Sequence, residues 1–457
     1  MAEIVFPTKF SFFNSLAKLI DTCSKSPKLL EIIQGYFRVI KSSNSTFLPE
    51  IQGFDSQESL DAEFMDYVNT SLVQISPQPI ISDNLNYLLE PQGDPDRIYM
   101  DGCFDLMHSG HYNAIRQAKA LGKFLVVGVH SDAEIARNKG PPVMNELERY
   151  TLARSCKWVD EVVENAPYSP TIELLNSLNC RYAAHGDDLS INENGDDCMS
   201  ILKRAGRCKI FKRTEGISTT QLVGKLLLMT KDVWEKVDTP VTSSSVFAKE
   251  VETTTQGNKK HLLTTSRRIS EFSNKKEPKP DDIIVYIDGT FDLFHIGHIE
   301  TLKRAKSLGN YLIVGVHDDE TVNKYKGSNF PIMNLHDRVM CVLSNKYVDE
   351  VIIGAPWAIS NELITGFNIK IVVQGTELKS DPSLKKCRKG SIDVDDDPFT
   401  ISKELGIYHE IESVSKINTQ TIIDRIIDNR TNFFNKFKVF AQREINYDKT
   451  KEFIQEV

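Results

Sequence analysis

The sequence predicts an α/β protein with two similar domains in tandem, each a parallel sheet flanked by helices. The first observation is a repeated segment: Asp101-Gly-Cys-Phe-Asp-Leu-Met-His-Ser-Gly-His111 returns as Asp288-Gly-Thr-Phe-Asp-Leu-Phe-His-Ile-Gly-His298. The second is that short apolar runs alternate with helical periodicity around both copies, a pattern typical of strands joined by helical crossovers. The repetition indicates an internal duplication, and the alternation indicates a doubly wound sheet in each copy.

The first copy is expected to span residues 96–232. Its predicted strands are the apolar runs Ile98–Met100, Phe124–Val129, Glu161–Val163, Arg181–Ala184 and Lys209–Phe211. Its predicted helices are Gly110–Leu121, Asn145–Cys156, Thr171–Leu178, Met199–Ala205 and Ser218–Met229. Asn145 followed by Glu148 predicts a capping box at the start of the second of these helices.

The second copy is expected to span residues 282–429 and to repeat this order. Its predicted strands are Ile283–Ile287, Tyr311–Val316, Glu350–Ile353 and Lys370–Val373. Asn334 and Asp337 take the cap positions of the matching helix.

Three segments fall outside the copies. Residues 1–95 carry apolar side chains at helical spacing and predict a helical extension. This extension either packs on the first copy or across a dimer interface, or it touches a membrane surface through its flanking basic residues. Residues 233–281 have the composition of a linker, within which Leu262–Phe272 is apolar enough to pack locally. Residues 430–457 predict a charged helical tail.

The bulk composition excludes several classes of protein. The chain has 457 residues and a formal net charge of −8, so no basic surface argues for a nucleic-acid partner. Its 8 cysteines form no Cys-x-x-Cys pair and indicate reduced thiols. The sequence shows no apolar run of about 18 residues and no signal peptide, so we expect a soluble, cytoplasmic protein that is at most peripheral to the endoplasmic reticulum membrane. A homodimer is one expected oligomeric state.

The repeated segment predicts a phosphate site. In an open parallel sheet, ligands bind beyond the carboxyl ends of the strands, where the loop Asp101–His108 leaves the first strand and the next helix begins near Gly110. Glycine lets the backbone approach a phosphate closely, so His108 and His111 can both face it. As imidazolium donors they would stabilise charge that grows in a transition state.

These residues resemble the cytidylyltransferase family, whose signature is His-x-Gly-His. Lys139-Gly-Pro-Pro, Ala166-Pro-Tyr168 and Arg213-Thr-Glu-Gly-Ile-Ser-Thr219 extend the likeness. The tandem arrangement is most similar to members that act on phosphoethanolamine, and the likeness covers about residues 97–430. It implies two Rossmann-like nucleotidyltransferase domains.

The resemblance also implies a reaction. A phosphomonoester oxygen of phosphoethanolamine attacks the α-phosphorus of CTP, releases pyrophosphate and forms CDP-ethanolamine for phosphatidylethanolamine synthesis. No covalent intermediate is needed, so the site mainly positions the two substrates and neutralises their phosphate charges. Mg²⁺ is expected to arrive on CTP, because the sequence offers no carboxylate cage to hold it as a protein-bound metal.

The resemblance assigns roles to residues of the first copy. His108 and His111 would hold α- and β-phosphate oxygens, Lys139 would bridge the α-phosphate and the attacking phosphate, and Arg213 would grip the β- and γ-phosphates. The remaining expected nucleotide contacts are Gly102, Cys103, Phe104, Asp105, His185, Gly186, Asp187, Thr214, Gly216, Ile217, Ser218 and Thr219.

Three of these residues also have ordinary interpretations. Lys139, which with Tyr168 is expected to bind phosphoethanolamine, could instead be a solvated surface lysine. The Tyr168 ring could contact the substrate ammonium or simply pack. Arg149 could form an ion pair on a helix face.

In the second copy the resemblance implies a weaker nucleotide site, formed by Thr290, Phe291, His295, His298, Lys326, Gln374, Gly375, Thr376 and Thr419. Its counterpart of the Arg213 segment is Ser413-Val-Ser-Lys-Ile-Asn-Thr419, which lacks the arginine and the glycine. Lys416 could replace the charge but not the planar fork of a guanidinium. We therefore expect the first copy to carry catalysis.

Other functions remain open at this point. Choline-phosphate and glycerol-phosphate cytidylyltransferases share His-x-Gly-His, although choline-type enzymes usually carry a lipid-binding helix where this chain has a second domain. Class I aminoacyl-tRNA synthetases share it too, but no Lys-Met-Ser-Lys-Ser follows here. A nucleotide-sensing protein is the non-enzymatic alternative, and the intact set of His108, His111, Lys139 and Arg213 argues against it.

Overall fold

A computed structural model describes residues 92–188, 190–214, 216–234, 262–327, 330–376, 397–413, 415–436 and 439. Nearly all of the predicted N-terminal extension, most of the predicted linker and most of the predicted C-terminal tail lie outside the described residues. Within the tail, residues 431–436 are helical. Among the described helices, none has both the length and the apolar character needed to cross a bilayer.

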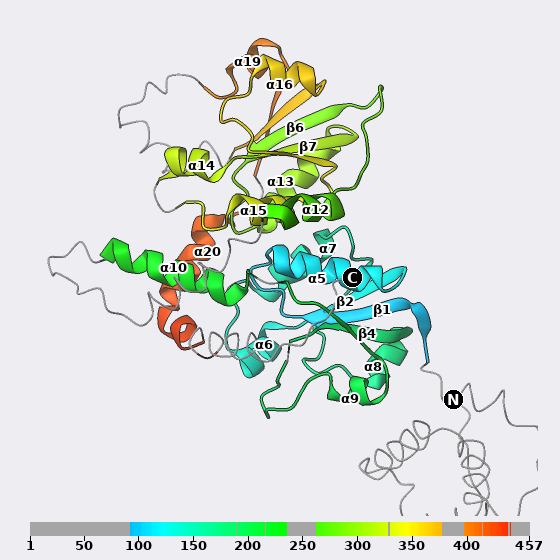
Figure 1. Ribbon diagram of the computed structural model, residues 1–457. Coiled ribbons are helices and arrows are strands. Elements are labelled where there is room, and N and C mark those ends of the chain that lie inside the picture. The colour runs from blue at the N-terminus through cyan, green and yellow to red at the C-terminus, as the bar shows by residue number, and fades with distance from the viewer. Residues whose placement is uncertain are drawn as a thin grey trace, which may run out of the picture. The chain divides into compact units, whose positions relative to one another are not determined.

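The first copy contains a five-stranded parallel sheet in the order β3-β2-β1-β4-β5 (Figure 1). The strands are β1 Asp94–Gly102, β2 Phe124–Val129, β3 Glu161–Glu164, β4 Cys180–Gly186 and β5 Cys208–Phe211. The helices are α5 Ser109–Ala120, α6 Asp132–Lys139, α7 Glu146–Ser155, α8 Ile172–Ser177, α9 Ser200–Arg204 and α10 Thr219–Trp234. The predicted strands are all present.

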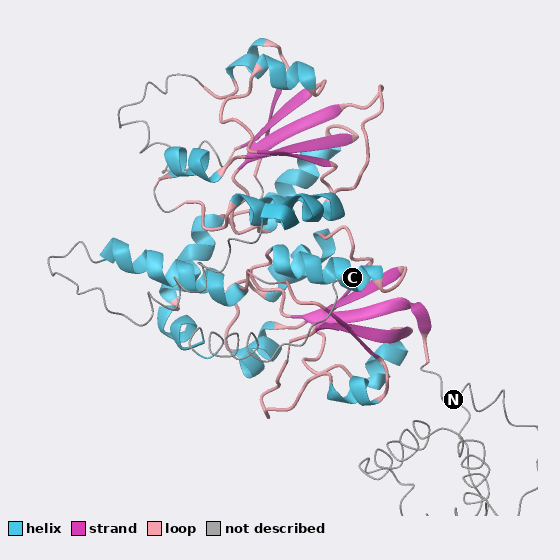
Figure 2. Cartoon of the chain, viewed as in Figure 1, coloured by secondary structure: helices cyan, strands magenta, loops and turns pink. Residues whose placement is uncertain are grey.

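The second copy repeats this topology, with a five-stranded parallel sheet in the order β10-β9-β6-β7-β8 (Figure 2). Its strands are β6 Ile284–Gly289, β7 Tyr311–Val316, β8 Glu350–Ile353, β9 Ile371–Gly375 and β10 Tyr408–Ile411. Its helices are α13 Ile296–Ser307, α14 Asp319–Lys326, α15 Leu335–Leu343, α16 Asn361–Gly366, α19 Thr400–Glu404 and α20 Thr419–Asp428. The predicted pair of Rossmann-like domains is confirmed.

Short, mostly exposed elements are the ones that sequence patterning did not predict. The helices α6 and α14 each bury a single residue, Ile135 and Val322, so neither shows an apolar stripe at helical spacing. Both helices end at the lysines of interest, Lys139 and Lys326. The edge strand β10 is similar, because only its last residue, Ile411, is buried.

The repeated loop adopts the same strained conformation in both copies. Phe104 and Leu106 have φ angles of 50° and 48°, and Phe291 and Leu293 have φ angles of 52° and 46°. Side chains other than glycine rarely adopt this region, and where they do the surrounding structure must hold them there. The repeated residues therefore specify an unusual backbone shape as well as a set of side chains.

The described residues of the two copies share one compact unit, apart from the segment Ile201–Arg207, which includes most of α9 and belongs to another unit. Helix α5 packs on α15 and α7 on α13, and one buried apolar cluster contains residues of both copies. Cys156 and Asn345, which occupy equivalent positions, form an antiparallel bridge. The helix α12, Leu262–Phe272, lies in the predicted linker and packs on α15, with Phe272 buried.

Candidate active site

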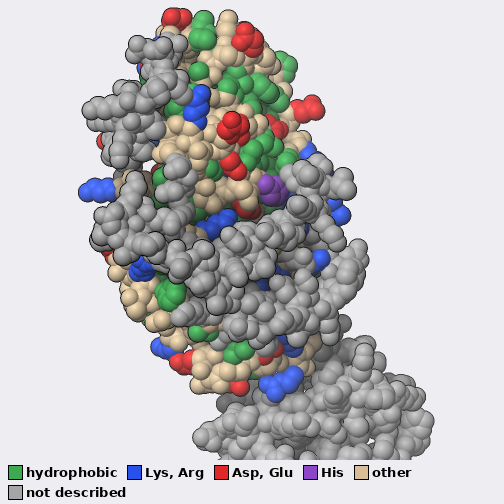
Figure 3. Space-filling view, turned by 60° about the vertical axis from the view of Figure 1, so that its left-hand side comes forward, with side chains coloured by type: hydrophobic (Ala, Val, Ile, Leu, Met, Phe, Trp, Pro, Cys, Tyr) green, Lys and Arg blue, Asp and Glu red, His purple; other side chains and the backbone are tan. Residues whose placement is uncertain are grey.

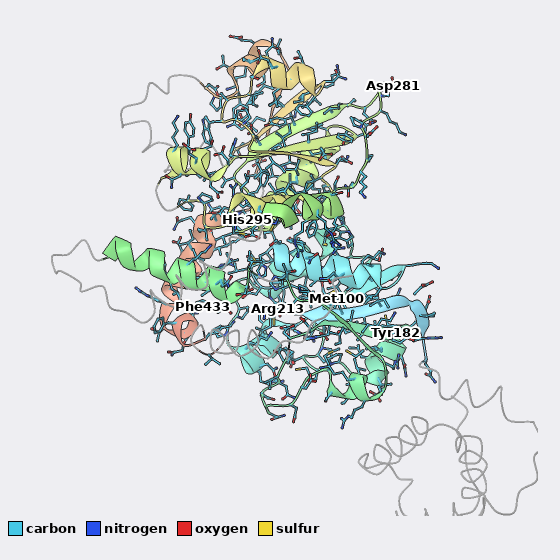
Figure 4. The ribbon with its side chains drawn as sticks, in the orientation of Figure 1. Met100, Tyr182, Arg213, Asp281, His295 and Phe433 are labelled. Carbon is cyan, nitrogen blue, oxygen red and sulfur yellow. The ribbon has the colours of Figure 1, made fainter. Side chains whose placement is uncertain are left out.

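The first copy encloses a pocket of about 750 Å³ that gathers most of the predicted site residues. His108 and His111 come from the start of α5, Lys139 from the end of α6, and Arg213 from the loop after β5. Figure 4 labels Met100, Arg213 and Phe433, which come from three separate segments and line this pocket. Further predicted residues that line it are Gly102, Cys103, Phe104, Asp105, Tyr168, His185, Gly186, Asp187, Thr214, Ile217, Ser218 and Thr219.

Gly216 is the one predicted residue of the first copy that does not line the pocket. Its φ of +87° is in the left-handed region, where glycine is favoured. Gly216 therefore serves the turn between Arg213 and α10. Ser218 begins α10 by accepting a hydrogen bond from the Gln221 amide at 3.1 Å, which confirms the predicted helix start.

The two histidines lie together at the N-terminus of α5. Their ring centroids are 4.1 Å apart, and His108 is only 5% exposed. His108 Nδ1 accepts a hydrogen bond from the Gly110 amide at 3.1 Å, so the proton of the ring sits on Nε2. Both rings thus flank the positive end of the helix dipole, which favours an anion there.

The surroundings of the two rings favour the neutral form, so the imidazolium donors expected beside a bound phosphate stay a prediction. Burial, His111 and Arg213 hold the pKa of His108 well below its ordinary value. Burial, together with Lys139 and Arg213, lowers the pKa of His111 to about 3. An imidazolium could not accept the Gly110 hydrogen bond either. The histidines are therefore neutral N–H donors, and the positive charge of the pocket comes from Lys139 and Arg213.

Lys139 points into the pocket and is not a solvated surface lysine. Its Nζ lies 5.6 Å from the centroid of the Tyr168 ring, which is itself buried. The negative charge that Cys103 can carry is the main influence that raises the pKa of Lys139, against the opposing effect of burial. The lysine is therefore protonated at neutral pH. A substrate ammonium at Tyr168 would share the ring with Lys139 and with His130, whose centroid is 5.1 Å away.

Arg213 and its neighbours form the far wall of the pocket. The Arg213 amide donates to Asp187 Oδ1 at 2.8 Å, and its guanidinium lies 3.9 Å from Asp188. Asn113 on α5 donates to Thr214 Oγ1 at 2.9 Å. Asp187 and Thr214 therefore shape this loop, and the guanidinium is left within reach of the pocket.

The side chain of Asp105 is engaged with the backbone of the protein. Its carboxylate accepts hydrogen bonds from the amides of Val143 and Met144, both at 2.9 Å, and its carbonyl accepts one from Thr219 at 3.0 Å. The Asp105 carboxylate and the Thr219 hydroxyl are thus engaged with protein atoms, and nucleotide contacts by these two residues, which both line the pocket, stay a prediction. Both groups tie the repeated loop to the Lys139 loop and to α10.

Arg149 lies on the buried face of α7 and holds the backbone of the repeated loop. Its guanidinium is 0% exposed and donates to the carbonyls of Met144 and Cys103 and to the Asp132 carboxylate. Arg338 makes the matching contacts in the second copy with Met333, Thr290 and Asp319. An ion pair does exist, as sequence reasoning considered, but its role is to hold the backbone of the loop.

Sequence reasoning assigned no role to several residues that line the pocket, among them Asp101, Phe433 and Lys436, and it placed Asp188 with His185 beside the cytosine or ribose. Asp101 opens the repeated segment and recurs as Asp288, which is the signal that could have found it. Burial raises the pKa of Asp101 to about 6, while His185, Tyr99 and Lys139 oppose the rise. Burial also opposes the ionisation of Asp188, but His185, Arg213 and Lys139 prevail and lower its pKa.

The equivalent histidines of the second copy have a different hydrogen bond. His298 Nδ1 accepts from the His295 amide at 3.3 Å, and the two rings stack with centroids 3.8 Å apart. The carbonyl of Ile417 comes so close to Gly297 that a Cβ there would lie 2.5 Å from the oxygen. In the first copy, the nearest atom of the matching Ile217 would lie 3.4 Å from a Cβ on Gly110. The start of α13 is therefore more closely covered than the start of α5.

Other predicted residues of the second copy are already engaged with protein atoms. Gln374 accepts from the Tyr408 hydroxyl at 2.5 Å, Thr376 accepts from the Ser413 amide at 3.0 Å, and Thr419 donates to the Asp292 carbonyl at 3.1 Å. The Thr290 hydroxyl is buried without a hydrogen-bond partner. Phe291 contacts the His298 ring with a centroid distance of 5.3 Å. Nucleotide binding by this copy stays a prediction.

A Rossmann-like sheet with paired histidines at its first helix, faced by a lysine and an arginine in one pocket, defines a nucleotidyltransferase site. The comparisons agree with this class. The cytidylyltransferase-like family matches residues 99–225 and 286–421, one match in each copy.

Relatives narrow the assignment. An ethanolamine-phosphate cytidylyltransferase of Dictyostelium discoideum is 50% identical over 359 residues, which cover 77% of this chain and 96% of the relative. One of Mus musculus is 41% identical over 362 residues, covering 74% and 87%. Choline-phosphate cytidylyltransferase A of Rattus norvegicus is 44% identical over only 135 residues, covering 29% and 37%. The chain belongs to the cytidylyltransferase-like family, and its matches across both copies are to ethanolamine-phosphate cytidylyltransferases.

Proposed function

We propose that this protein transfers a cytidylyl group from CTP to phosphoethanolamine, giving CDP-ethanolamine and pyrophosphate. The observation that carries the proposal is the convergence of His108, His111, Lys139 and Arg213 on one pocket. The names of the relatives that match over both copies support the choice of substrate. This reaction would place the protein in phosphatidylethanolamine synthesis.

In this reaction a phosphate oxygen of phosphoethanolamine forms a bond to the α-phosphorus of CTP as the bond to the bridging oxygen of pyrophosphate breaks. Lys139, protonated, is placed to neutralise the attacking phosphate and the α-phosphate together. The Nε2–H of His108 is free to donate to a phosphate oxygen, because Nδ1 is engaged by the Gly110 amide. Arg213 offers a planar fork to the β- and γ-phosphates, which leave as pyrophosphate.

Neutral histidines suit this role. Two imidazolium ions beside Lys139 and Arg213 would repel them, whereas neutral rings donate hydrogen bonds without adding charge. When the triphosphate enters, its negative charge favours protonation of the rings, so positive charge can grow where negative charge develops.

We also propose that Mg²⁺ enters with CTP. Among the described residues, no three His, Cys, Asp or Glu side chains are grouped so as to hold a metal ion. Asp101 and Asp188 line the pocket and offer carboxylate oxygens, which suits a hydrated ion that brings most of its ligands with it. The ion would supply further neutralisation of the triphosphate.

Within this proposal the first copy turns over substrate. The second copy lacks a counterpart of Arg213, so it would at most bind a cytidine nucleotide without turning it over. The protein is proposed to work in the cytoplasm, with a peripheral contact to the endoplasmic reticulum membrane and a homodimer as further proposals. Those two depend on residues 1–95, nearly all of which lie outside the described residues. No nucleic-acid partner is proposed, because basic and acidic side chains are interspersed over the described part of the face in Figure 3.

The test is a substrate comparison with purified protein, CTP and Mg²⁺. Pyrophosphate release should be at least about 100-fold faster with phosphoethanolamine than with phosphocholine, as expected when a site distinguishes a primary ammonium from a quaternary one. Equal rates would move the assignment to a general phospho-alcohol cytidylyltransferase. Activity with ATP but not with CTP would contradict the family assignment of the nucleotide.

A further inference from the structure

The active site of the first copy is lined in part by a helical segment, residues 431–436, that follows α20 of the second copy. Phe433 and Lys436 line the pocket, although they lie beyond α20, about 300 residues along the chain from His108. Phe433 is 2% exposed and belongs to the apolar cluster that contains residues of both copies. The helical segment that carries Lys436 is therefore anchored by an apolar side chain beside the catalytic residues.

Lys436 contacts the loop that follows the catalytic lysine. Its Nζ donates to the carbonyl of Pro141 at 2.9 Å and to that of Gly140 at 3.4 Å. Gly140 directly follows Lys139 and has a φ of +82°. Pro141 and Pro142 have no amide hydrogen, so this part of the loop can be held only through its carbonyls. An ammonium with three donors is suited to hold two carbonyls at once.

The other end of the same loop is held by the second copy. Arg425 on α20 donates to the Val143 carbonyl at 3.3 Å and forms a bidentate pair with Glu148, at 2.7 and 2.8 Å. From inside the first copy, Asp105 accepts the amides of Val143 and Met144. The segment between Lys139 and α7 is thus held by Asp105 of its own copy, by Arg425 of the second copy and by Lys436 of the segment that follows it.

The charge balance supports a positioning role at the site over an incidental surface contact. Burial lowers the pKa of Lys436, and the repulsion of Lys139 and Arg149 lowers it further, while the interactions with Asp105 and Cys103 oppose the shift. Lys436 therefore lies within electrostatic reach of Lys139 and of the loop that binds phosphate. An ammonium kept in such a place costs stability, so its hydrogen bonds to the two carbonyls must offset the cost.

We propose that Lys436, in the helical segment that follows the second copy, is a positioning residue for Lys139, and that this segment, with Arg425 of the second copy, completes the active site of the first copy. By holding the Gly140 and Pro141 carbonyls, Lys436 fixes the end of α6 and the direction in which Lys139 projects. The inference rests on the proposed cytidylyl transfer, in which Lys139 bridges the α-phosphate and the attacking phosphate. It assigns the second copy a task in catalysis that does not require a nucleotide site of its own.

The test compares Lys436→Met, Lys436→Arg and a control, Lys403→Met, in the full-length chain. Methionine keeps the length and the apolar stem but removes the donors, whereas arginine keeps donors and charge. Lys403 lies on α19, pairs with Asp397 and does not line the pocket. The measurements are kcat and KM for phosphoethanolamine, the Kd of CTP, and the thermal melting temperature.

Lys436→Met should lower kcat/KM for phosphoethanolamine about 10- to 100-fold, as a small displacement of a catalytic group does. The Kd of CTP should change less than about three-fold, Lys436→Arg should recover most of the loss, and Lys403→Met should match the wild type. Unchanged kinetics of Lys436→Met, or equal losses in both lysine-to-methionine variants, would overturn the inference. The inference would also be overturned if the loss of kcat/KM went together with a lower melting temperature and Lys436→Arg did not restore activity.

The two proposals fail in different ways. If the wild-type protein does not release pyrophosphate from CTP with phosphoethanolamine, the proposed function is wrong. If the wild type is active and Lys436→Met is equally active, the function stands and only the role of Lys436 is lost.

Discussion

The two copies share a backbone and differ in what their helix N-termini offer. In the first, His108 Nδ1 accepts the Gly110 amide, and the rings face a pocket of about 750 Å³. In the second, His298 Nδ1 accepts the His295 amide, the rings stack on each other, and the Ile417 carbonyl lies close to Gly297. The same motif therefore builds a donor pair in one copy and a self-engaged pair in the other.

This difference indicates that the motif determines the conformation of the loop, whereas residues far from the motif in the sequence determine whether the site can catalyse the reaction. The strained φ angles, the buried arginine clamp and the aspartate that holds the neighbouring loop are present in both copies. Arg213 and Gly216 are present only in the first, and Lys436 contacts the first. Changes at matched residues of the two copies should therefore affect stability alike, but only the changes in the first copy should also lower turnover.

The largest expected effect is at the triphosphate clamp. Arg213→Ala should lower turnover on the order of 10³-fold, because the guanidinium fork is the donor aimed at the leaving pyrophosphate. Lys416→Ala, at the position that Gly216 holds in the first copy, should leave turnover within about two-fold, because surface charges are screened by solvent. Initial rates of pyrophosphate release decide the matter, and the reverse pattern would move catalysis to the second copy.

A smaller effect is expected at the paired aspartates. In Asp105→Asn and Asp292→Asn, the side-chain NH2 of asparagine would face one buried backbone N–H, which is then left without an acceptor. Each change should therefore lower the free energy of unfolding by about 1–3 kcal/mol. Only Asp105→Asn should also lower turnover, about ten-fold, because only its loop carries the catalytic Lys139. Urea unfolding followed beside the rate assay measures both quantities. Equal losses of turnover would show that the two loops act alike.

The smallest effect concerns the pH dependence of stability. Burial raises the pKa of Asp101 to about 6 and that of Asp288 to about 7, both from an ordinary 3.8. Between these limits the native state keeps a proton that the unfolded state has lost, so stability falls as the pH rises through the window. Asp101→Asn and Asp288→Asn should flatten this fall between pH 4 and 7 in urea titrations. A steeper fall in either variant would contradict the burial argument.

Much of the fold and of the site could be predicted because their determinants are local. The four predicted catalytic residues each lie in a short segment next to a strand or helix end: His108, His111, Lys139 and Arg213. The repetition of the first segment in the second copy showed that the motif is not a chance match. The neutral state of the histidines could not be predicted, because it arises from burial and from cations that converge only in the folded chain.

Other features escaped prediction because they depend on contacts that span the chain. Asp105 and Arg149 recur in both copies, but recurrence does not reveal whether a polar side chain touches a ligand or the backbone. Helix α6 shows no apolar stripe and was therefore not predicted. Lys436 lies in a charged tail that has no motif, and only the packing of the two copies brings it to Gly140 and Pro141.

The most direct test of the central claim is a crystal structure of the protein with CTP and Mg²⁺ bound. The account predicts a triphosphate in the first copy, with its α- and β-phosphates at His108 and His111 and its β- and γ-phosphates between Arg213 and the start of α10. A triphosphate seated at His295 and His298, with the pocket of the first copy empty, would contradict it.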